Sequence, residues 1–235
     1  MKYLNKYKVN QGINLILNKI DLGQPLRWVY IYGHHRAGTT YMLQQYLKVS
    51  RRGTGDWMMH QFSEAIIAAE NRERQTLNIK KLKKNFRKNL LANAHIGGGQ
   101  HYDFIVKQAV GTQDLAQVKS EIQFFTDLFK SKPQELIFLY REPYGYWKSA
   151  KKKFSHENDE MFIHYKRAFE AFKENGGKAI EYGDELRNFF KMNPLFKNVQ
   201  IEEFSPKPVE KVEGLEKAEN DYNNFISLLN EHTAH

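Results

Sequence analysis

Short runs of apolar residues alternate along the chain with longer segments of helical periodicity. The first run, Trp28 to Tyr32, ends at Gly33 and predicts a buried strand. The segment from Tyr41 to Val49 then has apolar residues at helical spacing, and Thr39 and Thr40 suit the start of a helix. The pattern predicts a strand, a loop and a helix in succession.

The same alternation continues toward the C-terminus. Further strands are predicted at 104–106, 136–140, 179–182 and 199–201, and helices at 79–90, 113–130, 159–174 and 215–229. Strands that alternate with helices favour an α/β fold of three layers, in which helices flank a central, mostly parallel sheet. No internal repeat or linker interrupts the pattern, so we expect a single domain over residues 1–235.

Composition narrows the class of protein. With 41% hydrophobic and 27% charged residues, the chain is typical of a globular protein. No apolar run reaches the roughly 20 residues that span a bilayer, and the first residues lack the apolar stretch of a secretory signal. We therefore expect a soluble, cytoplasmic protein with no membrane span. The absence of cysteine excludes disulfides and thiolate ligands, and the net charge of +9 attracts anions.

The segment from Gly33 to Thr40, GHHRAGTT, has the spacing of a phosphate-binding loop and lies between the predicted strand and helix. In such a loop, backbone N–H groups and the helix start bind an anion. A nucleotide kinase needs a lysine at position 39, but this chain has Thr39 there and places its cation at Arg36. The strand at 136–140 ends at Arg141 rather than at an acidic residue that would hold magnesium. The sequence therefore predicts an anion site of arginines and hydroxyls, without a metal.

Three motifs resemble those of the sulfotransferases that use 3′-phosphoadenosine 5′-phosphosulfate (PAPS). The first is similar to the family's 5′-phosphosulfate loop and comprises Arg36, Ala37, Gly38, Thr39 and Thr40. The second, Arg-Glu-Pro at Arg141 with Ser149 eight positions later, resembles the pair that binds the 3′-phosphate. The third, residues 180–186, resembles the family's hydrophobic strand that leads into Tyr-Glu-Asp-Leu, and the resemblance implies Tyr182 near the adenine.

These motifs occur in the family's order over residues 28–186, about two thirds of the chain. The resemblance implies a P-loop-like sulfotransferase fold. It also implies in-line transfer of a sulfuryl group from PAPS to a hydroxyl or, as the less favoured acceptor, an amine. Arg36 is then the main catalytic candidate as well as a cofactor ligand. Lys107 resembles a basic residue that some members place near the sulfate, with an ordinary surface lysine as the alternative.

A general base is expected near the acceptor hydroxyl, because its pKa is high. Cytosolic members of the family use a His two residues after a strand-end lysine, where this chain has Ala109. Members that act on proteins or glycosaminoglycans use a Glu beyond the loop. Asp56, His60 and Glu64 all fall in the interval where those members carry it. Glu64 ranks first because a helix at 61–71 would place it in the first turn, His60 ranks second because it lies one turn earlier, and Asp56 ranks third. For each, a capping or solvated side chain is the alternative.

Two other functions fit parts of the pattern. A nucleotide kinase with an altered loop would bind ATP together with magnesium. A non-enzymatic module would bind nucleic acid through the lysine-rich helix at 79–90, with a steep dependence on salt. No motif of interleaved aromatic and basic residues supports the second option, so nucleic acid is not an expected partner. The expected partner is a sulfate acceptor, and its candidate classes are glycans, peptides, lipids and small alcohols.

Overall fold

The computed structural model describes residues 25–50, 103–110, 116–152, 158–201, 204 and 211–233. The elements follow in chain order as β1 (Arg27–His34), α2 (Thr39–Val49), β2 (Asp103–Val110), α5 (Ala116–Phe129), β3 (Glu135–Tyr140), α6 (Pro143–Lys151), α7 (Asn158–Asn175), β4 (Lys178–Glu181), α8 (Asp184–Met192), the 3₁₀ turn η1 (Pro194–Phe196) and α9 (Glu216–Thr233). None of the described helices has the length and apolar character needed to cross a membrane.

The four strands form one parallel sheet in the order β2-β1-β3-β4. Strand β1 pairs with β2 along its whole length, and it pairs with β3 up to Gly33, which lies opposite Leu139. Strand β4 pairs with β3 on the far side. Because all strands run the same way, their carboxyl ends meet at one edge of the sheet.

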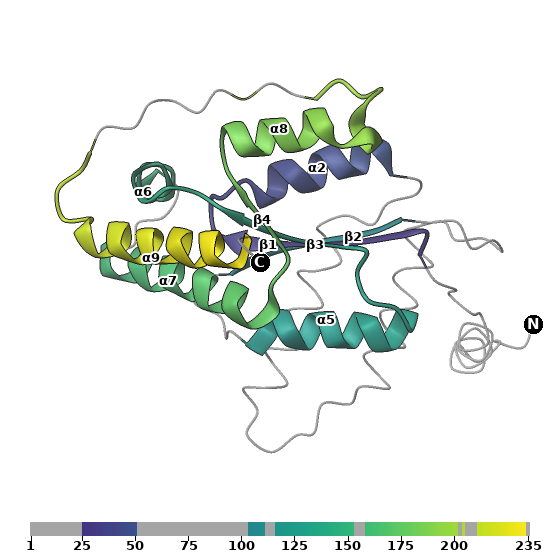
Figure 1. The fold of residues 1–235 in the computed structure, drawn as a ribbon, viewed down its shortest axis with the longest axis horizontal. Coiled ribbons are helices and arrows are strands. Elements are labelled where there is room, and N and C mark those ends of the chain that lie inside the picture. The colour runs from purple at the N-terminus through teal and green to yellow at the C-terminus, as the bar shows by residue number, and fades with distance from the viewer. Residues whose placement is uncertain are drawn as a thin grey trace, which may run out of the picture.

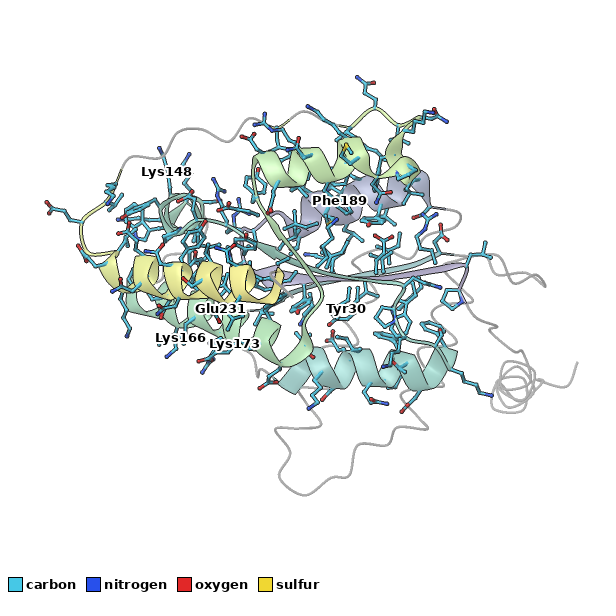
Figure 2. The ribbon with its side chains drawn as sticks, in the orientation of Figure 1. Tyr30, Lys148, Lys166, Lys173, Phe189 and Glu231 are labelled. Atoms are coloured by element: carbon cyan, nitrogen blue, oxygen red, sulfur yellow. The ribbon has the colours of Figure 1, made fainter. Side chains whose placement is uncertain are left out.

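Helices cover both faces of this sheet. Helices α2 and α8 lie on one face, and α5, α7 and α9 lie on the other (Figure 1). Along β1, Val29 and Ile31 belong to the core beneath α2 and α8. The alternate residues Trp28, Tyr30 and Tyr32 belong to the opposite core, where Figure 2 shows Tyr30 on the side of α5. This alternation is the two-residue period of a strand, and it confirms the three-layer α/β fold with a parallel central sheet.

The prediction of a strand at 199–201 is wrong. After η1 the chain continues in a turn, in which the N–H of Val199 donates to the carbonyl of Phe196. Ile201 packs against the core on the α2 side instead of pairing in the sheet. The apolar residues of this segment therefore reflect burial and not a strand. The lysine-rich helix predicted at 79–90, on which the nucleic-acid hypothesis depends, lies outside the described residues.

Strands β1 and β3 approach closely at Gly33, where a side chain has no room. A Cβ at this position would overlap the carbonyl group of Leu139, which is backbone and cannot turn aside. We expect Gly33→Ala to lower the free energy of unfolding by about 3 kcal/mol or more in urea titrations. The control is Gly214→Ala, where φ is +84° but no atom of the described residues lies within 4 Å of the added Cβ, and a loss of about 1–2 kcal/mol is expected. Equal losses in the two variants would contradict the close approach.

Candidate anion site at the sheet edge

The candidate site lies where the chain leaves β1 and β3. The loop after β1 leads into α2, and β3 leads into Arg141 at the same edge of the sheet. From β1 the chain goes to β2 on one side and later returns to β3 on the other. Ligands of open parallel sheets bind in the crevice at such a reversal of strand order. The topology therefore brings the first two motifs to a position suited to a ligand.

The loop between β1 and α2 is a tight turn. The N–H of Ala37 donates to the carbonyl of His34 at 3.2 Å. Arg36 has a φ of +66°, in the left-handed region that disfavours a side chain by roughly 1–2 kcal/mol. Gly38, with a φ of +91°, precedes α2, whose first turn carries no acidic residue and is capped by no side chain among the described residues. The first N–H groups of α2 and their partial positive charge are thus suited to an anion.

Tyr182 joins the loop to Arg141. A Cβ on Gly38 would lie 2.6 Å from Cδ2 of Tyr182, so the tyrosine ring rests on the loop glycine. The guanidinium carbon of Arg141 lies 4.7 Å from the centroid of the same ring. Phe204 stacks on Tyr182 with ring centroids 4.9 Å apart. The third motif therefore contacts both of the others.

Arg36 contacts the other end of the second motif. Its Nε donates to Oγ of Ser149 at 2.9 Å, across 113 positions of sequence. Burial lowers the pKa of Arg141, and the positive charge of Arg36 lowers it as well, while Tyr182 and Glu142 act in the opposite direction. The two arginines are thus close enough to repel one another. An anion bound between them would relieve that repulsion.

Helix α6 begins in a way that leaves room for Arg141. Glu142 caps this helix by accepting the N–H of Gly145 at 2.9 Å, and its carboxylate lies 3.9 Å from Nε of Arg141. A Cβ on Gly145 would lie 2.6 Å from Nε of Arg141. The arginine side chain therefore occupies the space above a glycine in the first turn of α6.

His34 connects β1 to the chain at Arg141. This residue is fully buried, and its Nε2 accepts the backbone N–H of Arg141 at 2.9 Å. Its Nδ1 lies 2.8 Å from the carbonyl of His35, to which it donates in the neutral form. Its ring packs on Tyr146 and Tyr165, with centroids 4.8 and 4.9 Å away. His34 lies in the segment from Gly33 to Thr40, but the part that resembles the family's loop begins at Arg36, and no local sequence pattern predicts the bond from Arg141 to His34.

The burial of His34 predicts a dependence of stability on pH. Desolvation, the largest cause, lowers the pKa of His34 from 6.5 to about 3, so the folded protein keeps it neutral. Below pH 6.5 the unfolded chain binds a proton that the folded chain does not, and stability falls by about 1.4 kcal/mol per pH unit. We expect the difference in unfolding free energy between the wild type and His34→Gln to shrink at that rate as pH falls from 6.5 toward 4. A difference that is constant over this range in urea titrations would contradict the assignment.

The structure brings one further candidate to the loop. Lys107 lies on β2, and its Nζ donates to Oγ1 of Thr40 at 3.1 Å. Thr40 is exposed, whereas Ala37 and Thr39 are buried beneath the loop. The three candidates for the general base, Glu64, His60 and Asp56, lie outside the described residues.

Within the described part of the chain, no three His, Asp or Glu side chains gather in a way that could hold a metal ion. A cavity of about 860 Å³ lies beside β4 and the C-terminal parts of α7 and α9, where Phe172, Lys178 and Leu229 are among its lining residues. None of the predicted site residues lines this cavity, so it gives no support to the anion site.

Known proteins give little guidance to this site. No protein-family model matches the chain, and no curated protein matches it. Among solved structures, the chain is similar to the sulfotransferase domain of the olefin synthase of Synechococcus PCC 7002. The identity is 16% and the TM-score 0.42, over 72% of this chain and 71% of that one. Values this low do not assign a function, so the function proposed below depends on the residues of the site.

Proposed function

We propose that this protein is a sulfotransferase that moves a sulfuryl group from PAPS to an acceptor hydroxyl, with an amine as the less favoured acceptor. The observation that carries the proposal is the meeting of three distant motifs at one edge of the sheet. Arg36 contacts Ser149, and Tyr182 contacts both Gly38 and Arg141. This convergence brings the groups proposed for the two anionic ends of one ligand to the same edge of the sheet.

The chemistry of the cluster fits such a donor. Its groups are two guanidinium ions, the hydroxyl of Ser149 and the uncapped start of α2, and all of them can donate hydrogen bonds to anionic oxygens. In the proposed mode, the loop from Arg36 to Thr40 binds the 5′-phosphosulfate, and Arg141 with Ser149 binds the 3′-phosphate. Tyr182 would lie against the adenosine. These contacts fix the orientation of the donor from both ends.

PAPS is a substrate that supplies the sulfuryl group and leaves as adenosine 3′,5′-bisphosphate. In the proposed step the acceptor oxygen forms a bond to sulfur while the bond from sulfur to the bridging phosphate oxygen breaks. A base takes the proton of the acceptor hydroxyl, and Glu64, His60 and Asp56 are the proposed candidates in that order. Arg36 stabilises the negative charge that develops on the leaving phosphate, and Lys107 adds positive charge beside Thr40.

Transfer from radiolabelled PAPS tests this function. The wild type is incubated with representative glycans, peptides, lipids and small alcohols, and the label in each acceptor is counted. Lys148→Ala, which removes an exposed cation of α6, serves as a matched control. We expect label in at least one class for the wild type and for the control. Label in none of these classes would contradict the proposal.

A further inference from the structure

We propose that His34 is a positioning residue that holds the main chain of Arg141 and thereby sets the preference for a nucleotide with a 3′-phosphate. This inference rests on the proposed function, in which Arg141 binds that phosphate. His34 itself would not touch the nucleotide. It would act from the buried side of the sheet edge, through the backbone of Arg141.

The geometry shows how both backbone groups of Arg141 are fixed. The regular pairing of β1 with β3 ends where Gly33 lies opposite Leu139. Beyond that point the imidazole of His34 accepts the N–H of Arg141 at 2.9 Å. The hydroxyl of Tyr165, from α7, donates to the carbonyl of Arg141 at 2.7 Å. Two side chains from different elements therefore replace the missing strand partner.

The imidazole is itself held in place. It is fully buried, contacts the rings of Tyr146 and Tyr165, and is close to the carbonyl of His35 through Nδ1. Because Nδ1 faces a carbonyl oxygen, it carries the proton, and Nε2 is left as the acceptor that Arg141 needs. The ring therefore links the start of the glycine loop to the end of β3 with a fixed orientation.

A shift of this backbone would move the guanidinium group. The side chain of Arg141 leaves the main chain between Gly145 and the ring of Tyr182, in a space with little freedom. Errors of about 1 Å in the position of a binding group can reduce function by up to about 10²-fold. Loss of the His34 bond should therefore weaken recognition of the 3′-phosphate more than recognition of the 5′ end.

Two substitutions separate the bonds that His34 makes. The amide of His34→Gln can place its oxygen near Nε2 and still accept the N–H of Arg141. The shorter His34→Asn can place its amide near Nδ1, where it can serve the carbonyl of His35 but cannot reach Arg141. The two variants are otherwise similar in polarity, so they form a matched pair.

The test measures the ratio of affinities for adenosine 3′,5′-bisphosphate and AMP by calorimetry. We expect His34→Asn to reduce the preference for the bisphosphate about tenfold, the equivalent of one hydrogen bond, and His34→Gln to preserve most of it. In an Arg141→Ala background, His34→Asn should have no further effect on the ratio. An unchanged ratio, or an equal reduction in that background, would overturn the proposal. A general loss of stability would weaken the binding of both ligands alike and leave the ratio unchanged.

Amide hydrogen exchange at Arg141 provides a measurement that needs no nucleotide. We expect exchange at this N–H to become faster in His34→Asn and to stay close to the wild-type rate in His34→Gln.

If the wild type binds neither nucleotide, the proposed function fails, and the exchange rates alone decide whether His34 holds Arg141. If His34→Asn does not fold, Tyr165→Phe takes its place, since it removes only the hydroxyl that bonds to Arg141. An unchanged bisphosphate preference in Tyr165→Phe would then count against the proposal.

Discussion

Arg36→Ala is expected to lower the rate of sulfuryl transfer by about 10²- to 10³-fold, the range seen when a group that stabilises transition-state charge is removed. Arg36 is exposed, lies within the glycine loop and contacts Ser149, so few packing interactions depend on it. The measurement is the initial rate of label transfer from PAPS at saturating acceptor. Arg36→Lys keeps the positive charge and should retain more activity than Arg36→Ala.

The left-handed backbone of Arg36 supplies a sharper control. At a φ of +66°, glycine is favoured over any side chain, so Arg36→Gly should be within about 1 kcal/mol of the wild type in stability or above it. The same variant should be as inactive as Arg36→Ala. A strained arginine retained at this position would then reflect function rather than folding. Wild-type rates in Arg36→Gly would contradict a catalytic role for Arg36.

Arg141→Ala is expected to weaken the binding of adenosine 3′,5′-bisphosphate by about 10- to 150-fold. This range corresponds to about 1.5–3 kcal/mol for hydrogen bonds from a charged group, and the partial burial of Arg141 supports its upper part. AMP lacks the 3′-phosphate, so its affinity should change much less. Both affinities are measured by isothermal titration.

Lys148→Ala is the matched control for this variant. Lys148 is an exposed cation on α6, the helix that follows Arg141, and Figure 2 shows its side chain at the outer side of α6. Its removal changes the net charge as Arg141→Ala does, but it should affect both nucleotides equally and weakly. If Lys148→Ala reduced bisphosphate binding as much as Arg141→Ala, the general positive field would explain the binding, and the specific role of Arg141 would be wrong.

Local sequence pattern predicts most of the described fold. The apolar runs of β1 and β3 and the helical periodicity of α7 and α9 are signals contained within single segments. The sheet is covered on both faces, so its buried strands are recognisable from short continuous apolar runs. The segment at 199–201 has the same type of residues but packs against the core on the α2 side, because periodicity does not distinguish a strand from an apolar turn. The sequence prediction omits helix α8, which begins at Asp184 inside the motif at 180–186, although Leu186, Phe189 and Phe190 have helical spacing.

The candidate site, too, is predictable from the sequence only in part. The motifs that resemble those of the sulfotransferases point to Arg36, Arg141, Ser149 and Tyr182, and the structure brings their elements together. The bond from Arg141 to His34 joins residues 107 positions apart, and no local pattern encodes such a contact. The motif identifies the arginine that follows β3, but only the tertiary contacts with His34 and Tyr165 explain how its backbone is held.

In the proposed binding mode, Arg36 and Arg141 bind opposite ends of one nucleotide. The most direct test is a calorimetric titration of the wild-type protein with adenosine 3′,5′-bisphosphate in the presence of EDTA. We predict saturable binding with one nucleotide per chain, without magnesium, and weaker binding of AMP. No binding of the bisphosphate, together with ATP binding that requires magnesium, would contradict this account and favour a nucleotide kinase.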